Sequence, residues 1–154
     1  MSRGVGATAS SERAGAGEAG LGATVVGGDV VYCAAGYGVG STAVRITKDG
    51  GAFKATELWF SKGNQPVANH WSTPVYHDGH LYGMFSFKEY GTGPLKCVEL
   101  ATGQVKWEKP NFGAGNVILA GDTVLALSDR GELVTQHHRA IQLRVTNTAL
   151  GVPM

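Results

Sequence analysis

The stretch from Leu95 to Pro110 reads LKCVELATGQVKWEKP. Apolar and polar residues alternate on both sides of its Ala-Thr-Gly, which is typical of two half-buried β-strands joined by a tight turn. The second of these strands carries a large aromatic residue, Trp107, just past the turn. Another tryptophan, Trp59, stands 48 residues earlier. The arrangement therefore recurs along the chain.

Three β-hairpins are predicted at similar distances from one another. Their turns lie at Gly27-Gly28-Asp29, Asp78-Gly79 and Gly121-Asp122, between runs rich in Val, Leu and aromatic residues. Asp-Gly predicts a type I′ turn, because that turn requires positive φ at both central residues. The three aspartates are 49 and 44 residues apart, a third strand follows each hairpin, and the first two units add a fourth. A repeat of about 40–50 residues with four short strands is typical of a β-propeller blade.

We therefore predict an all-β fold, an incomplete β-propeller of four-stranded antiparallel blades that spans residues 23–134 and has about two and a half blades. The predicted blades are residues 23–61, residues 72–110, and a third from 115 to 134 or beyond. A β-sandwich with evenly spaced strands is the alternative; it explains the alternation but not a tryptophan that returns at the repeat distance.

The two ends of the chain differ from this pattern. Residues 1–22 form a Gly/Ala-rich tail, and we expect it to be disordered because it cannot bury enough apolar surface. Residues 135–154 have neither an acidic-x-x-Thr-Gly turn nor a tryptophan. We expect an atypical C-terminal tail there, with one strand over IQLRVTN or a short helix over HHRAIQLRV.

Tryptophans at the ends of the first two units suit the packing of one sheet on the next. Trp59 and Trp107 are predicted to be docking residues that wedge between neighbouring sheets, each burying roughly 150–250 Å². Thr102 and Gly103 supply the turn that returns the chain for the strand of Trp107. An aromatic platform for a ligand is the alternative role for the indoles.

The segment from Cys97 to Trp107 resembles the tryptophan-docking motif of quinoprotein-type (PQQ-like) β-propeller repeats. In that motif a small residue, an acidic residue, Thr-Gly and Trp fall at this spacing. Here Cys97 stands at the usual Ala and Glu99 at the usual Asp, while Thr102-Gly103 and Trp107 match. Ser72-Thr73-Pro74-Val75, ahead of the Asp-Gly turn, resembles the start of the same repeat.

The first unit departs from the motif by an insertion. Thirteen residues separate Ile46 from Trp59, against seven from Leu100 to Trp107. The six extra residues are predicted to lengthen the last hairpin of this unit around Asp49-Gly50-Gly51.

The resemblance implies a non-catalytic scaffold or binding module, like the outer-membrane assembly lipoprotein of this superfamily. The alternative is a fragment of a PQQ-dependent alcohol dehydrogenase-type oxidoreductase, in which Ca²⁺ lies beside the quinone. Such dehydrogenases characteristically have adjacent cysteines near the cofactor, and this chain has none. No convincing Glu, Asn and Asp cluster supplies the about six to eight oxygen ligands of Ca²⁺. We predict no catalytic residue and no cofactor, and expect PQQ with calcium only under the alternative.

An incomplete propeller leaves both terminal sheets with an apolar face and an open edge. We therefore expect a fragment of a larger propeller, completed by further blades or by a protein partner. The competing hypothesis is that two or more copies of the chain associate to complete a ring. A net charge of +1 and a pI near 7.8 argue against nucleic acid as a partner. No run approaches the ~18 apolar residues of a membrane span.

The compartment stays open. The resemblance implies a periplasmic or exported protein, whereas the N-terminal stretch lacks the continuous apolar run of a secretory signal. Cys33 and Cys97 both lie in apolar strand-like runs, where we expect two inert thiols. A disulfide between them is the alternative, and it would need their Cα atoms within about 7 Å.

Few other residues suggest chemistry. His70, His77 and His80 are candidate zinc ligands, but without cysteine or a fixed spacing we predict exposed turn residues and no metal site. His137-His138 falls in the atypical tail. No nucleophile elbow surrounds Ser41 or Ser72. If a ligand site exists, we expect it in the loops AGYGVGST (35–42) and GNQPVANHW (63–71), because loops at the rim of a rigid scaffold carry such contacts.

Overall fold

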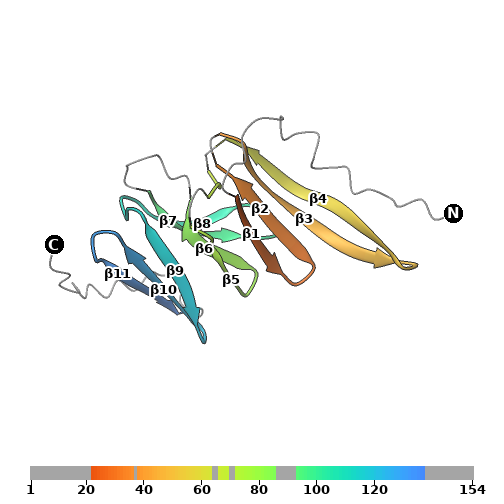
Figure 1. Ribbon diagram of the computed structural model, residues 1–154. Helices are drawn as coiled ribbons and strands as arrows, with labels where there is room; N and C mark the ends of the chain where they lie inside the picture. Colours follow the sequence, from red (N-terminus) through yellow and green to blue (C-terminus); the bar gives the residue numbers. More distant parts are fainter. Residues whose placement is uncertain (1–21, 37, 64–65, 70–71, 86–92, 138–154) are drawn as a thin grey trace.

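A computed structural model of the 154-residue chain describes residues 22–36, 38–63, 66–69, 72–85 and 93–137. These residues form eleven strands in three separate antiparallel sheets and no helix (Figure 1). In each sheet the strands lie in chain order, so sequence neighbours are also hydrogen-bonded neighbours. The predicted all-β fold is confirmed for the described part of the chain, in which no helix could span a membrane.

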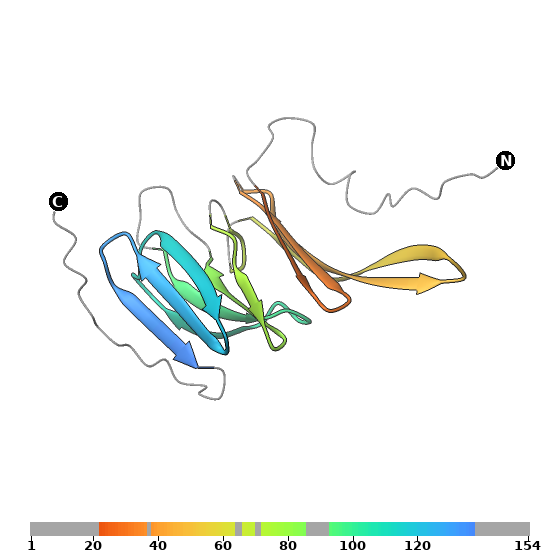
Figure 2. The same ribbon diagram turned by 60° about the horizontal axis from the view of Figure 1, so that its bottom comes forward.

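The first sheet contains the longest strands. Its members are β1 (Gly22–Gly27), β2 (Val30–Ala35), β3 (Gly40–Asp49) and β4 (Ala52–Lys62). Past Arg45, which pairs with Val30 at the start of β2, strands β3 and β4 continue as a two-stranded ribbon that projects from the sheet (Figure 2). The ribbon closes at Gly50-Gly51, both with positive φ, where the sequence predicts the lengthened hairpin.

The second sheet is more compact. It is built from β5 (Val75–His77), β6 (His80–Met84), β7 (Leu95–Glu99) and β8 (Val105–Lys109). The turn between β5 and β6 has φ of 42° at Asp78 and 77° at Gly79, as the predicted type I′ turn requires. β5 begins at Val75 and not at residue 72. The reason is Pro74, which has no N–H to donate to the sheet and fills the space beside Gly83.

The third sheet has three strands among the described residues: β9 (Gly115–Ala120), β10 (Thr123–Ser128) and β11 (Leu133–His137). β11 ends at His137, which agrees with a third unit that reaches 134 or beyond, and it includes the first three residues of the predicted C-terminal tail. The predicted strand over IQLRVTN lies outside the described residues, as does the alternative helix over HHRAIQLRV apart from His137, which ends β11. So does the predicted N-terminal tail, apart from Gly22, at which β1 begins.

The sheets pack face to face in chain order (Figures 1 and 2). We call the packing of the first sheet on the second the first boundary, and that of the second on the third the second boundary. Buried at the first boundary are Val30, Tyr32, Ala34, Ala43, Val67, Leu81, Phe85, Val98 and Leu100. Buried at the second are Tyr82, Met84, Leu95, Cys97, Phe112, Val117, Val124, Ala126 and Val134.

Strand alternation explains why the second sheet serves both boundaries. Successive side chains of a strand point to opposite faces, so Leu81 enters the first boundary and Tyr82 the second. Val98 and Cys97 divide in the same way. A β-sandwich has two packed sheets, whereas the described residues form three, and the middle one is buried on both faces.

Candidate functional site

The best-defined contact between sheets is made by Trp59. This residue lies on β4, and its indole N–H donates a hydrogen bond of 2.8 Å to the carbonyl oxygen of Leu100 in the second sheet. The ring also lies against the turn after β7: a methyl group added at Gly103 would lie 2.9 Å from Cδ2 of Trp59. One side chain of the first sheet therefore contacts two backbone positions of the next.

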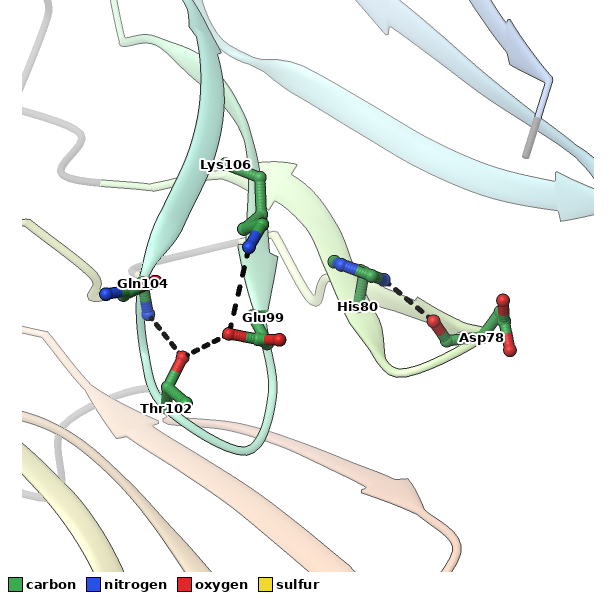
Figure 3. A network of polar contacts seen from close by, with 6 residues as sticks. All are labelled: Asp78, His80, Glu99, Thr102, Gln104 and Lys106. Carbon is green, nitrogen blue, oxygen red and sulfur yellow. Dashed lines mark hydrogen bonds and ion pairs between the residues drawn. The ribbon is translucent and has the colours of Figure 1, made fainter. Parts of the chain in front are cut away.

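The turn that receives Trp59 is held in shape by its own residues. The N–H groups of Thr102 and Gly103 donate to the carbonyl oxygen of Glu99, at 3.4 and 2.9 Å. The Thr102 hydroxyl donates to Oε2 of Glu99 at 2.6 Å and accepts from the N–H of Gln104 at 3.2 Å (Figure 3). Gly103 has φ of +72°, a backbone conformation that favours glycine. The acidic-x-x-Thr-Gly pattern therefore fixes the conformation of this turn through these hydrogen bonds and the positive φ of Gly103.

The carboxylate of Glu99 is the charged centre of this turn. The hydrogen bond from Thr102 lowers the pKa of Glu99, and the charge of Lys106, whose Nζ lies 3.9 Å from Oε2, lowers it further. An ionised carboxylate is the better acceptor for the Thr102 hydroxyl. The charged form of Glu99 therefore helps to hold the turn against which Trp59 lies.

A second turn supports the first. The N–H of Leu100 donates to the carbonyl oxygen of Gly79 at 2.9 Å, which ties the turn after β7 to the turn before β6. His80 lies beside them, with Nδ1 2.7 Å from the carbonyl oxygen of Asp78 (Figure 3). The residues predicted for the docking turn and those of the type I′ turn thus form one hydrogen-bonded unit.

Trp107 occupies the equivalent place on the second sheet and lies against the second boundary. Its ring centroid is 6.2 Å from that of Tyr82, at 49°, and the pair Trp59–Tyr32 has 6.1 Å and 39°. The aromatic pair therefore repeats. Among the described residues, however, no hydrogen bond or glycine contact like those of Trp59 is found for the Trp107 indole.

A buried polar network closes one end of the first boundary. The hydroxyl of Tyr32 donates to Oδ1 of Asn69 at 2.6 Å, and Nδ2 of Asn69 donates to the carbonyl oxygen of Met84 at 2.8 Å. Asn69 and Tyr32 have no exposed surface. Burial raises the pKa of Tyr32 well above its usual value, so its hydroxyl keeps the proton that it donates.

Lys96 makes a second set of buried polar contacts. Its side chain is 4% exposed, and Nζ lies 2.9 Å from the carbonyl oxygen of Pro66 and 3.3 Å from Oε2 of Glu108. A buried ammonium group requires such partners, because desolvation otherwise penalises the charge. The repeat pattern did not identify Lys96, Asn69 or Tyr32. The one local indication of a buried polar contact is Lys96 itself, a lysine among the apolar residues of β7.

The two loops in which the sequence places any ligand site do lie together. The hydroxyl of Ser41, from loop 35–42, donates to the carbonyl oxygen of Val67, from loop 63–71, and the N–H of Gly63 donates to the carbonyl oxygen of Val39 at 3.4 Å. Val67 is buried. Their described residues join the first sheet to the second by internal contacts.

The candidate zinc ligands are only partly described. His77 and His80 pair across the type I′ turn, and Nε2 of His77 lies 4.0 Å from Oδ1 of Asp122 in the third sheet. His70 and His138 lie outside the described residues, and His137 ends β11. Within the described ranges no group of three His, Cys, Asp or Glu side chains is placed to hold a metal ion.

The two cysteines are free thiols, so the disulfide alternative is wrong. Cys97 is buried at the second boundary, and burial raises the pKa of its thiol to about 11. Cys33 is half-buried on β2, with its sulfur 3.9 Å from the Thr24 hydroxyl.

Comparison with other proteins does not assign a family. The chain matches no protein-family model and no curated protein sequence. Its function is therefore inferred from the geometry of the two boundaries.

Proposed function

We propose that the chain forms consecutive blades of a PQQ-like β-propeller and acts as a non-catalytic scaffold or binding module. Three features support this proposal. The sheets are meanders in chain order, they pack face to face, and the middle sheet is buried on both sides. Radial repetition of small antiparallel sheets is the arrangement that defines a propeller.

The contact of Trp59 with Leu100 and Gly103 carries the proposal. It joins the tryptophan of one sheet to the Thr-Gly turn of the next, and both are the residues that the resemblance to quinoprotein-type repeats singles out. A β-sandwich does not require a tryptophan and a Thr-Gly turn to meet at a sheet boundary.

A scaffold role fits the use of the polar residues. The hydroxyls of Tyr32 and Ser41, the amide of Asn69 and the ammonium of Lys96 all contact other groups of the chain. These contacts fix the sheets relative to one another. A larger propeller also fits the outer sheets, on which Val26 and Ile118 are 62% and 59% exposed. Further blades would cover such apolar side chains.

The competing role, a piece of a PQQ-dependent dehydrogenase, predicts cofactor binding. We would add PQQ with Ca²⁺ to the protein and record the absorbance of the quinone and the melting temperature. A ligand that binds the native state stabilises it, so a dehydrogenase fragment would show a higher Tm and a changed spectrum. A scaffold would show neither.

Two controls make the result specific. Ca²⁺ without PQQ reports binding of the ion alone, and PQQ with a chelator reports adsorption of the quinone to apolar surface. A rise in Tm that requires both components would contradict the scaffold role, and it would leave the sheet packing in place.

A further inference from the structure

The two boundaries have the same polarity. We call the face that a sheet turns toward the next sheet in the chain its forward face, and the opposite one its backward face. Tyr32 and Tyr82 each stand third after the hairpin turn and lie on forward faces, buried at the first and second boundaries. Leu81 and Val124 each stand second after the turn and lie on backward faces. The same packing therefore occurs twice.

This polarity leaves one forward face and one backward face without a neighbouring sheet among the described residues. On the third sheet, Leu125 pairs with Ile118 and Leu127 pairs with Leu133, so these apolar residues share the forward face. Ile118 and Leu127 are 59% and 44% exposed.

The backward face of the first sheet is the other face that has no neighbouring sheet among the described residues. Val31 pairs with Val26 on one side and with Val44 on the other, which forms an aliphatic row across three strands. Val26 is 62% exposed. Contiguous apolar surface of this kind marks an interaction site.

We propose that a second copy of this chain covers both faces, with the backward face of the first sheet of each copy packed on the forward face of the third sheet of the other. This assembly rests on the proposed propeller. The contact would continue the packing seen at the first and second boundaries, and the residues named on both faces are aliphatic. The aliphatic row covers β1 to β3 and ends at Glu57, the partner of Val44 on β4.

The number of sheets supports closure with two copies. Each chain contributes the three described sheets, so two copies supply about six, within the roughly 4–8 blades with which propellers close. Three copies would exceed that range. Both contacts are head-to-tail, and a head-to-tail contact forms a closed ring when its rotation completes the circle.

The first measurement is the mass of the 154-residue chain by light scattering and sedimentation equilibrium. We expect about twice the 16.0 kDa of the chain. Val26→Lys on the backward face and the double variant Ile118→Lys/Leu127→Lys on the forward face should each halve the mass. The matched control is Val39→Lys: Val39 is 46% exposed and lies in the turn between β2 and β3, on neither face. This variant should keep the mass of the wild type.

Mixing the variants tests the polarity of the contact. In a head-to-tail ring, a Val26→Lys chain and an Ile118→Lys/Leu127→Lys chain still share one unaltered contact, so their mixture should regain part of the dimer. A wild-type protein that stays monomeric would overturn the proposal. So would loss of the dimer with only one of the two face variants, or a mass that keeps growing with concentration.

Near-UV circular dichroism separates failure of this proposal from failure of the propeller. The signal of the boundary aromatics, Trp59 and Tyr32 among them, should persist in the monomeric variants. Persistence without a wild-type dimer would refute only the association. Loss of the signal in a folded wild-type chain would refute the propeller as well.

Discussion

The two boundaries use the same aromatic pair but differ in how the tryptophan is held. At the first boundary the indole N–H of Trp59 donates to Leu100, and the ring covers Gly103. At the second boundary Trp107 packs beside Tyr82. β11 is the last described strand, so the comparison at this boundary is limited to the packing of the ring. Trp59 therefore combines ring packing with a hydrogen bond and a close contact to the turn of the next sheet.

The difference separates two contributions to the packing of one sheet on the next: burial of the indole ring and directed contacts of the indole with the turn. Burial of an aromatic ring is non-directional and depends on area. The hydrogen bond to a backbone carbonyl and the contact with a glycine fix distance and orientation. The first boundary has both contributions, whereas the second shows the burial. Substitutions at matched positions of the two boundaries can measure each contribution.

The largest effect is expected at the tryptophans. Trp59→Ala should lower the free energy of unfolding by about 3–5 kcal/mol, because it removes a large ring from the boundary and leaves the Leu100 carbonyl without its donor. Trp107→Ala should cost about 1–2 kcal/mol less, since the described residues show only its packing. Denaturant titrations of both variants measure the difference. A cost for Trp107→Ala equal to or above that for Trp59→Ala would contradict the distinction between the boundaries.

The next largest effect is expected on the reaction rates of the two thiols. Because the pKa of Cys97 is raised to about 11, roughly a thousandth of this thiol is ionised at about pH 8, and the thiolate is the species that reacts. We expect Cys97 to react with iodoacetamide more slowly than Cys33, because Cys97 is buried whereas Cys33 is half-buried.

Single-cysteine variants, Cys33→Ser and Cys97→Ser, give each rate separately, and the rates in denaturant supply the control. Equal rates in the native protein would mean that the second boundary is open to solvent at Cys97.

A smaller effect is expected at Gly103. Gly103→Ala adds a methyl group 2.9 Å from Trp59 at φ of +72°, while Gly28→Ala adds one in open space at φ of +64°. Both carry the left-handed backbone penalty of about 1 kcal/mol, so the excess cost of Gly103→Ala, about 1–2 kcal/mol, reports the contact with Trp59. The excess should disappear when Trp59 is already alanine. A persistent excess would show that the indole does not lie on the turn.

The smallest effect is a pH dependence. Because the pKa of Glu99 is lowered in the folded protein, its contribution to stability is present above its unfolded pKa of about 4.3 and is lost as the pH falls through the folded value. Thr102→Val removes the main cause and should bring the pKa of Glu99 back toward its ordinary range. An NMR titration of the Glu99 carboxyl measures both values, and an unchanged pKa in the variant would contradict the role of the Thr102 hydroxyl.

Much of the strand pattern could be predicted because its causes are local. Alternation, Asp-Gly at residues 78–79 and the insertion at Asp49-Gly50-Gly51 each depend on residues close in sequence, and the strands and turns lie there. The second blade is predicted from residue 72, whereas its first strand, β5, begins at Val75. Pro74 cannot donate to the ladder, which is a local rule that the alternation hid.

The network at the first boundary could not be predicted for the opposite reason. Tyr32 and Asn69 are 37 residues apart, and Lys96 reaches Pro66 across 30. No spacing rule links such positions, because the contact exists only after two sheets have packed. The repeat distance predicted that Trp59 has a structural role. It did not specify that the indole would reach the backbone of Leu100.

The position of the Trp59 ring is the most direct test of the packing between sheets. We would record nuclear Overhauser effects in the isotope-labelled protein. The predicted result is cross-peaks from the Trp59 indole protons to the α-protons of Gly103, together with slow exchange of the indole N–H that donates to Leu100. An indole without these cross-peaks whose N–H exchanges as fast as in an unfolded chain would contradict the packing, and with it the proposed propeller.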